Sequence, residues 1–262
     1  MSQTLTGRTA LVTGASSGLG LDFARELAAR GASLVLVARR ADALQALADE
    51  LRARHGSHVQ VLPADLGDAA AREQLAAQLH ACGTAVDVLV NNAGFGVYGD
   101  FADSDWLKLD QMLQVNVVAL SHLSRLFAGP MAARGWGRIL QVSSTGAFSP
   151  SPSYAAYSAS KSYVLSLGIA LDQELKARGV RCTTVCPGVT ATDFLKVSGQ
   201  KQNWYHRATM MTSAEVARSG IDALLAGRSH RVTGWLNAIM AFSTRFMPRG
   251  LSAVVTGFLM KN

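Results

Sequence analysis

The sequence predicts a single α/β domain built on a doubly wound parallel sheet. Short apolar runs rich in β-branched residues alternate with Ala- and Leu-rich segments of helical period along the first two-thirds of the chain. Repeated strand–helix alternation is typical of right-handed βαβ units, which form one parallel sheet covered by helices on both faces. No linker-like stretch or block of like charges interrupts this pattern, so we expect one domain over residues 1–262.

The predicted strands are short and mostly apolar, as expected for strands that are buried on both faces. They cover residues 9–14, 33–38, 59–62, 86–91, 138–143, 181–186 and, near the end of the chain, 230–235. The segments of helical period cover residues 19–30, 41–54, 69–81, 104–133, 155–178 and 213–226. Their order predicts a sheet of about seven strands.

The composition favours a well-packed interior, because apolar residues make up 49% of the chain and charged residues 16%. The formal net charge of +7 suits either anionic partners or a solvated basic surface. No nucleic-acid-binding motif is present. The sequence therefore predicts a small-molecule substrate and no nucleic-acid partner.

The cysteines and histidines do not indicate a metal site. Cys82, Cys182 and Cys186 are an odd number without CxxC spacing, which argues against a disulfide framework and for a reducing compartment. The histidines show no ligand spacing such as HExxH. The N-terminus has no charged region followed by a long apolar stretch, so we expect no signal peptide and a cytoplasmic protein.

A glycine-rich turn, "TGASSGLG" at residues 13–20, lies between the first predicted strand and the first predicted helix. Glycine lets the backbone approach a pyrophosphate, whose charge is stabilised at the helix N-terminus. The spacing GxxxGxG differs from the commoner GxGxxG, but its position favours a Rossmann-type nucleotide site. The predicted cofactor-binding residues of this turn are Gly14, Ser16, Ser17, Gly18, Leu19 and Gly20.

The end of the second predicted strand favours NADP(H) over NAD(H). A site for NAD usually has an acidic residue there, whereas an arginine accommodates the extra phosphate of NADP. This chain has Ala38, Arg39 and Arg40. Arg39 and Arg40 are therefore predicted phosphate ligands, with solvated loop residues as the alternative.

The segment "YSASK" places Tyr157 and Lys161 four residues apart on one face of a predicted helix. A phenol with its ordinary pKa near 10 exchanges protons poorly at neutral pH, and a nearby ammonium group lowers that pKa. Two further polar residues accompany this pair. Ser144, at the end of a predicted strand, could polarise a carbonyl, and Asn116 is either a buried amide bonded to backbone or a holder of water for proton relay.

These motifs, together with "NNAG" at 91–94 and "PGVTAT" at 187–192, resemble the short-chain dehydrogenase/reductases over roughly residues 5–195. The resemblance implies hydride transfer between a nicotinamide and a carbonyl carbon. It implies that Tyr157 is the catalytic acid/base, Lys161 its pKa modifier and a ribose ligand, Ser144 the carbonyl stabiliser and Asn116 the proton-relay residue. It also implies cofactor contacts at Asp65, Leu66, Asn92, Ala93, Gly94, Pro187, Gly188, Val189 and Thr192.

The substrate is less well defined by the sequence. The motifs "VLVARR" and "NNAGFGVYGDF" and the tail resemble the ketoacyl-reductase and hydroxysteroid-dehydrogenase-like branch of the family. Residues 193–212 mix aromatic and flexible apolar side chains, which suits either a lid over a bulky hydrophobic carbonyl compound or simple packing on the body. Reduction of 3-oxoacyl thioesters and a non-catalytic regulator that binds a dinucleotide are the alternative functions.

The last part of the chain, about residues 235–262, is apolar but broken by Arg245, Pro248 and Arg249. Spanning a bilayer needs about 20 nearly uninterrupted apolar residues, so this tail is predicted to pack on the body or to contact a membrane peripherally. The predicted helices 104–133 and 155–178 carry wide apolar stripes. These stripes predict a homo-oligomer, either a dimer or a tetramer.

Overall fold

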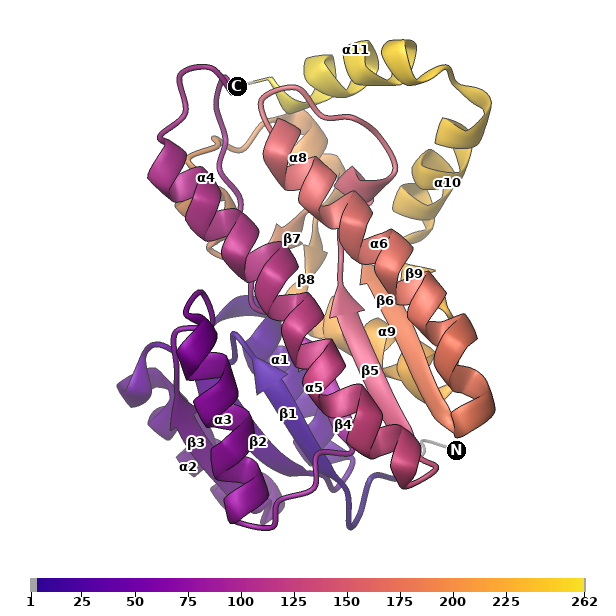
Figure 1. Ribbon diagram of the computed structural model, residues 1–262. Helices are drawn as coiled ribbons and strands as arrows, with labels where there is room; N and C mark the ends of the chain where they lie inside the picture. The colour runs from indigo at the N-terminus through magenta and orange to yellow at the C-terminus, as the bar shows by residue number, and fades with distance from the viewer. Residues whose placement is uncertain (1–3, 262) are drawn as a thin grey trace.

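The computed structural model describes residues 4–261 and has a central parallel sheet with helices on both faces (Figure 1). Seven strands pair in parallel in the order β3-β2-β1-β4-β5-β6-β9. The strand order reverses between β1 and β4, which is where ligands bind in open sheets of this kind. The predicted fold class is confirmed.

The strands of this sheet begin and end close to the predicted positions. They are β1 (Thr9–Thr13), β2 (Ser33–Ala38), β3 (Val59–Pro63), β4 (Val88–Asn91), β5 (Gly137–Val142), β6 (Val180–Cys186) and β9 (His230–Val232). The last strand is shorter than predicted. Gly234, with φ 81°, turns the chain out of the sheet and into helix α10 (Trp235–Ser243).

Alternation along the strands sends neighbouring side chains to opposite faces of the sheet. One face packs against α1 (Gly18–Ala29), α2 (Ala41–His55) and α9 (Ser213–Leu225). The other face packs against α3 (Ala69–Ala81), α5 (Leu120–Ala133) and the end of α6 (Ala155–Leu175). Ala10 and Val12 belong to the first core and Leu11 to the second, so the strands are buried on both sides.

The long helix predicted over residues 104–133 is interrupted. It consists of α4 (Trp106–Leu113), a π-helical segment (Gln114–Ala119) and α5. π-helical turns inside helices often occur at functional sites, because they shift a side chain out of the regular spacing. Here the shifted segment contains Asn116, which is fully buried.

Residues 192–210 form an excursion between two short paired strands, β7 (Thr190–Ala191) and β8 (Met211–Thr212). The excursion contains the short helices α7 (Phe194–Ser198) and α8 (Trp204–Thr209). The chain ends with α10, a 3₁₀ turn (Thr244–Phe246) and α11 (Arg249–Met260), which lie beyond α8 at the top of Figure 1. Within residues 4–261, none of the helices combines the length and the apolar character needed to cross a membrane.

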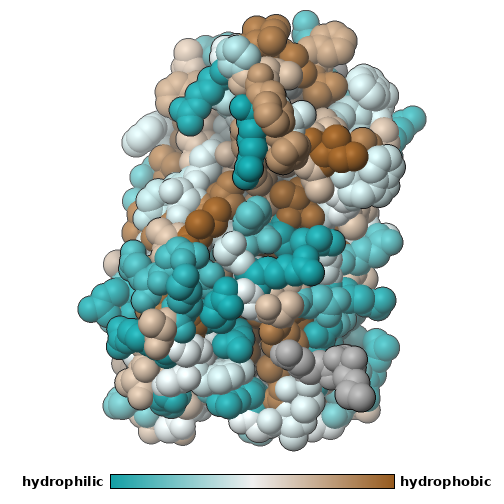
Figure 2. All heavy atoms as spheres, turned by 90° about the vertical axis from the view of Figure 1, so that its right-hand side faces the viewer, coloured by the Kyte–Doolittle hydropathy of each residue, from teal (hydrophilic) through white to brown (hydrophobic). Residues whose placement is uncertain are grey.

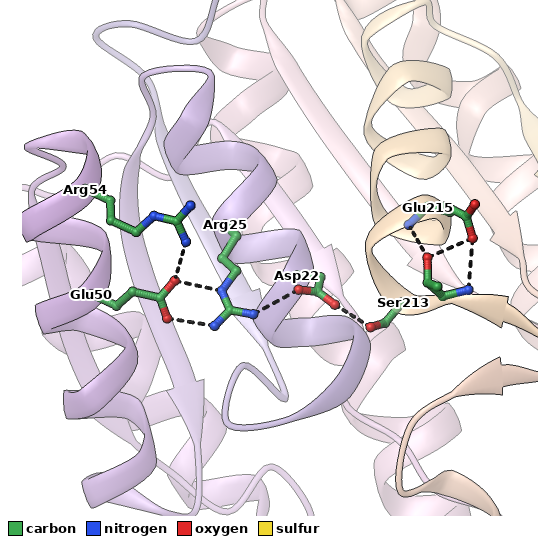
Figure 3. A network of polar contacts seen from close by, with 7 residues as sticks. Asp22, Arg25, Glu50, Arg54, Ser213 and Glu215 are labelled. Atoms are coloured by element: carbon green, nitrogen blue, oxygen red, sulfur yellow. Dashed lines mark hydrogen bonds and ion pairs between the residues drawn. The ribbon is translucent and has the colours of Figure 1, made fainter.

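A network of charged side chains joins the helices on the first face (Figure 3). Arg25 of α1 donates two hydrogen bonds to Glu50 of α2, at 2.9 and 2.7 Å, and a third to Asp22 at 3.2 Å. These bonds raise the pKa of Arg25 and lower that of Glu50. Asp22 also accepts a hydrogen bond from Ser213 at the start of α9. The helix that follows the glycine-rich turn is thus held to both of its neighbours.

Candidate active site

The loops that follow β1 and β4 meet at the point where the strand order reverses, and Thr13 at the end of β1 joins them. Its hydroxyl accepts hydrogen bonds from the backbone N–H groups of Asn92 and Ala93, at 2.9 and 3.0 Å, and donates one to the carbonyl of Val90. The side-chain amide of Asn92 donates to the carbonyl of Thr13 at 2.9 Å. The predicted site residues Asn92 and Ala93 therefore lie against the glycine-rich turn. Thr13, which the sequence analysis did not single out, holds them there.

The glycine-rich turn has the geometry that a phosphate site needs. Gly14 and Gly18 have φ values of 66° and 55°, which side chains other than glycine rarely adopt. A Cβ at Gly20 would lie 2.2 Å from the carbonyl oxygen of Gly14, so only glycine allows this close approach. Ser17 precedes α1 but its side chain does not cap the helix. The N-terminal N–H groups of α1 thus lack a side-chain acceptor from Ser17, and they face the turn where an anion binds in such folds.

Arg39 and Arg40 follow β2 beside this turn, but only Arg40 is bonded to it. The Arg40 guanidinium donates to the carbonyl and to the hydroxyl of Ser16, at 3.0 and 3.2 Å. Arg39 is exposed, and in the described part of the chain its side chain makes no hydrogen bond or ion pair. The two arginines are therefore in different situations, one supporting the turn and the other available to a ligand.

The remaining predicted cofactor residues are distributed along the same edge of the sheet. Asp65 follows β3 and accepts a hydrogen bond from the backbone of Gly67, and Leu66 is buried beside it. Thr192 lies across from the glycine-rich turn, since a Cβ at Gly18 would be 3.2 Å from its methyl group. The loop after β6 is tied to the Ser144 region by a 2.8 Å hydrogen bond from the backbone of Thr145 to Pro187.

Gly188 is packed closely against Asn237 of α10, a residue that the sequence analysis missed. A Cβ at Gly188 would lie 2.4 Å from the Asn237 amide nitrogen. Asn237 is buried and donates to the carbonyl of Thr233, but its oxygen has no hydrogen-bond partner among residues 4–261. It lies in the first turns of the apolar tail, and no motif distinguishes it in the sequence.

The structure brings Ser144, Tyr157 and Lys161 together at the carboxyl end of β5. Lys161 is buried on α6, and its ammonium group donates to the carbonyl of Val142 at 2.9 Å and lies 5.8 Å from the centre of the Tyr157 ring. Of the two adjacent serines, Ser143 is buried and donates to the carbonyl of Lys161. The Ser144 hydroxyl accepts from the backbone of Gly146 and keeps its proton available for another acceptor. This arrangement favours Ser144 over Ser143 as the residue that meets a substrate.

Burial changes the titration of both catalytic candidates. Desolvation raises the pKa of Tyr157, and the nearby Ser144 hydroxyl acts in the opposite direction. Desolvation lowers the pKa of Lys161 to about 8. Burial dominates in this geometry, so the pKa of Tyr157 is raised, whereas the sequence predicted that Lys161 would lower it.

Asn116 connects the π-helical segment to the loop that follows β4. Its amide nitrogen donates to the carbonyl of Phe95 at 2.9 Å, and its oxygen accepts from the backbone of Phe95 at 3.1 Å. A weaker contact of 3.3 Å reaches the hydroxyl of Ser160, one residue before Lys161. Gly94 lies so close to Asn116 that a side chain would not fit, since a Cβ there would be 2.7 Å from the Asn116 oxygen. Asn116 is therefore a buried amide bonded to backbone, and it lies within reach of the helix that carries Tyr157 and Lys161.

Tyr157 belongs to a row of aromatic rings. Adjacent ring centres in the series Tyr98, Tyr154, Tyr157 and Phe194 are 5.1, 5.5 and 5.3 Å apart. Phe194 belongs to the lid segment named in the sequence analysis, whereas Tyr98 and Tyr154 were missed as site residues. The hydroxyl of Tyr154 bonds to Ser198 and Gln200, so the row is tied to residues 192–210. Trp204 of the same segment is exposed and does not join the row.

Comparison with known proteins gives consistent matches. A sequence model described as short chain dehydrogenase matches residues 8–203. The very-long-chain 3-oxoacyl-CoA reductase of Anas platyrhynchos is 31% identical over 246 residues, which cover 91% of this chain and 77% of that protein. A short-chain dehydrogenase from Sphingobium yanoikuyae, solved in complex with NADPH, has a TM-score of 0.83 at 29% identity and covers 93% and 94% of the two chains. The bulky-bulky ketone specific alcohol dehydrogenase from Comamonas testosteroni has a TM-score of 0.77 at 26% identity, with 93% of each chain covered.

Proposed function

Because the chain belongs to the short-chain dehydrogenase/reductase family, we propose that it interconverts a bulky hydrophobic carbonyl compound and its secondary alcohol with NADP(H). Membership makes the chain an oxidoreductase that acts on CH–OH or C=O groups with a nicotinamide cofactor, and not a non-catalytic regulator. The cofactor preference, the substrate and the role of each site residue are proposed here. Their main support is the grouping of Ser144, Tyr157 and Lys161 at one end of the sheet.

The roles of the catalytic residues follow from their hydrogen-bonding capacity. In the reductive direction, the Tyr157 hydroxyl supplies the proton that the carbonyl oxygen gains, and Ser144 donates a hydrogen bond that polarises the same oxygen. A bound nicotinamide cofactor supplies the hydride. Lys161 would hold the ribose of the bound cofactor, and its ammonium group favours ionisation of the phenol, which opposes the burial that raises the Tyr157 pKa. Asn116 positions the loop at Phe95 and would hold a water through which the proton relay runs.

The cofactor-binding role is proposed for the residues along the edge of the sheet. The turn at Gly14, Gly18 and Gly20 and the start of α1 would hold the pyrophosphate. Asp65 and Leu66 would contact the adenine, and Asn92 to Gly94, Pro187 to Val189 and Thr192 would contact the rest of the cofactor. Arg39, exposed and free of protein partners among residues 4–261, is the proposed ligand of the additional phosphate of NADP. The NADPH complex of the Sphingobium yanoikuyae relative supports this preference.

The aromatic row supports a bulky hydrophobic substrate. Tyr154 and Phe194 pack against the Tyr157 ring, and Tyr98 extends the row on Tyr154. Phe194 belongs to residues 193–212, and Tyr154 is bonded to them. We propose that this segment acts as a lid over the substrate. The name of the Comamonas testosteroni relative indicates bulky ketones, which is consistent with this assignment.

Reduction of a 3-oxoacyl thioester is the second candidate. Its support is the relative from Anas platyrhynchos, which is named as a very-long-chain 3-oxoacyl-CoA reductase. A long acyl chain would use the same aromatic row, so the two candidates share a hydrophobic substrate surface.

A screen of NADPH oxidation tests both candidates. The substrates are 3-oxoacyl thioesters of increasing chain length, ketosteroids, aldehydes and small diketones, each with NADPH and with NADH. We expect turnover to be fastest with NADPH and a bulky ketone, and negligible with acetone-sized compounds. Equal rates on small and bulky carbonyls would refute the substrate assignment, and a preference for long 3-oxoacyl thioesters over ketosteroids would select the second candidate.

A further inference from the structure

Helix α11 has an unusual orientation, because its polar side chains face the protein and its apolar side chains face solvent. The hydroxyls of Ser252 and Thr256 contact the hydroxyl of Ser149, at 2.6 and 2.8 Å. The opposite side of the helix consists of exposed apolar residues, namely Leu251, Val254, Val255 and Phe258, the last of which is 73% exposed. Surface helices normally show the reverse pattern. The outer side of α11 therefore has the character of a face that something else covers.

The same surface continues onto α10 and the turn that follows it. Its exposed apolar residues recur at helical spacing: Trp235, Ile239, Phe242 and Phe246. Trp235 and Phe246 are each 78% exposed. Figure 2 shows hydrophobic side chains gathered at this end of the molecule, above a body that is largely hydrophilic. We call these eight residues of the two helices and the turn the α10–α11 surface.

The charged side chains of the chain segment that carries the α10–α11 surface all have one sign. From residue 223 to the end of the chain there is no Asp or Glu, and the charged side chains are Arg228, Arg231, Arg245, Arg249 and Lys261. Arg245 and Arg249 are exposed between the two helices, and the Arg245 guanidinium lies 5.5 Å from the centre of the Phe242 ring. Long basic side chains beside aromatic rings can keep their charge in water while their stems cover apolar surface. A second copy of the chain docked here would bring like charges together, whereas an anionic surface would neutralise them.

We propose that the α10–α11 surface docks on the surface of an anionic lipid bilayer. Aromatic and aliphatic side chains would enter the boundary between headgroups and acyl chains, and Arg245 and Arg249 would meet lipid phosphates. The helices lie on the membrane and do not cross it, since no helix within residues 4–261 is long and apolar enough to span. This combination of an apolar face and exclusively basic charge is characteristic of interfacial helices.

Helix α11, which carries part of the α10–α11 surface, is hydrogen-bonded directly to the lid. The carbonyl groups at the C-terminus of α11 accept hydrogen bonds from Tyr98, Gln200 and Asn203. Gln200 reaches Met260 at 2.7 Å, and Asn203 reaches Leu259 and Lys261 at 2.9 and 3.0 Å. A docked molecule therefore holds the lid next to the lipid, where a hydrophobic substrate is dissolved. Delivery of substrate from the bilayer rests on the proposed function, whereas the docking itself does not.

Flotation of the full-length protein with vesicles tests the docking independently of any activity. Vesicles of phosphatidylcholine alone are compared with vesicles that contain phosphatidylserine. The variant Phe246→Ser/Phe258→Ser removes two exposed rings of the α10–α11 surface, and Phe101→Ser removes an exposed ring elsewhere. We expect the unaltered protein to bind the anionic vesicles, the first variant to bind roughly tenfold or more weakly, and the second to bind normally.

Two double variants that each remove two basic side chains test the electrostatic contribution to membrane binding. Arg245→Gln/Arg249→Gln should lower the partition onto anionic vesicles roughly tenfold or more. Lys176→Gln/Arg178→Gln, directly after the C-terminus of α6, should leave this partition unchanged. Circular dichroism and NADPH affinity check that every variant is folded. The proposal is overturned if the unaltered protein fails to float with anionic vesicles, or if the α10–α11 variants bind as well as their controls. It is also overturned if Phe246→Ser/Phe258→Ser instead lowers the oligomeric mass in the absence of lipid, since the surface would then join two copies.

Discussion

The ammonium group of Lys161 lies 5.8 Å from the centre of the Tyr157 ring and is bonded to the carbonyl of Val142. The phenol and the ammonium group are both desolvated, which favours the neutral form of each. The protonation states of Tyr157 and Lys161 thus depend on the polar groups that a cofactor or substrate brings into the site. Ribose hydroxyls and a carbonyl oxygen would provide the polar partners that the protein alone does not provide to these groups.

The lowered pKa of Lys161 predicts a specific pH dependence of stability. Below pH 8 the lysine is protonated in both the folded and the unfolded chain, so its burial penalty is constant. Between pH 8 and 10.5 the unfolded chain binds more protons, so the free energy of unfolding contributed by this group rises with pH. The difference in free energy of unfolding between the unaltered protein and Lys161→Met should rise by about 2 kcal/mol from pH 7.5 to 9.5. Urea titrations without cofactor measure it, and a constant difference would show that Lys161 is not desolvated.

The close approach of Gly94 to Asn116 predicts a position-specific effect of a methyl group. In Gly94→Ala the new Cβ would lie 2.7 Å from the Asn116 oxygen and 3.4 Å from the Lys161 nitrogen. Displacing Asn116 breaks its hydrogen bonds with Phe95, which should cost about 1–3 kcal/mol of stability and lower kcat. Gly129→Ala in α5 is the matched control, because its nearest neighbour would be 3.9 Å away and alanine favours helix. Equal thermal unfolding and activity in the two variants would contradict the positioning role of Asn116.

The different positions of Arg39 and Arg40 predict different losses of cofactor affinity. Arg39→Ala should raise the Kd of NADPH roughly tenfold or more and leave that of NADH unchanged, since it removes only the ligand of the extra phosphate. Arg40→Ala should weaken both cofactors, because Arg40 supports the glycine-rich turn through Ser16. The double change Ala38→Asp/Arg39→Ala should move the preference toward NAD(H). Fluorescence titration measures the affinity of each variant and of the unaltered protein for both cofactors, and unaltered binding of NADPH to Arg39→Ala would exclude this residue as the phosphate ligand.

Exposed apolar side chains on α4 predict an assembly of identical chains. Trp106 and Leu107 are 68% and 61% exposed, and Val118 in the π-helical segment is also exposed. We expect a dimer or tetramer that pairs through the helices over residues 104–133 and 155–178. Trp106→Glu/Leu107→Glu should lower the mass measured by light scattering at micromolar concentration. A strictly monomeric unaltered protein would contradict this prediction.

The strands and the glycine-rich turn could be predicted from sequence because each has a strong local signal. Strands buried on both faces are continuous apolar runs, and β1 to β6 begin and end within a few residues of the predicted positions. Gly14 and Gly18 were predicted from their spacing, and their positive φ values explain why glycine is needed. The π-helical segment at Asn116 was not predicted. The apolar residues of this stretch recur at a helical period whether or not one turn is wider; they are Met112, Val115, Ala119 and Leu123.

The features that the sequence did not predict depend on contacts between distant segments. The pKa of Tyr157 rises because its phenol is buried, and Phe194, from a distant part of the chain, packs against its ring. Burial of this kind cannot be judged from the spacing of Tyr157 and Lys161 alone. The apolar tail had two possible arrangements, packed or exposed. Only the contacts of Ser252 and Thr256 with Ser149 determine which side of α11 faces solvent.

The central claim is that Tyr157 transfers the proton, and the turnover of Tyr157→Phe with NADPH tests it most directly. The best ketone of the substrate screen is used, and Tyr163→Phe, which removes an exposed phenol from the same helix, is the control. Tyr157→Phe should lower kcat by roughly 100-fold or more while the Kd of NADPH stays within about twofold, because only the transferable proton is lost. Tyr163→Phe should retain nearly full activity. Normal kcat in Tyr157→Phe would contradict the assigned mechanism.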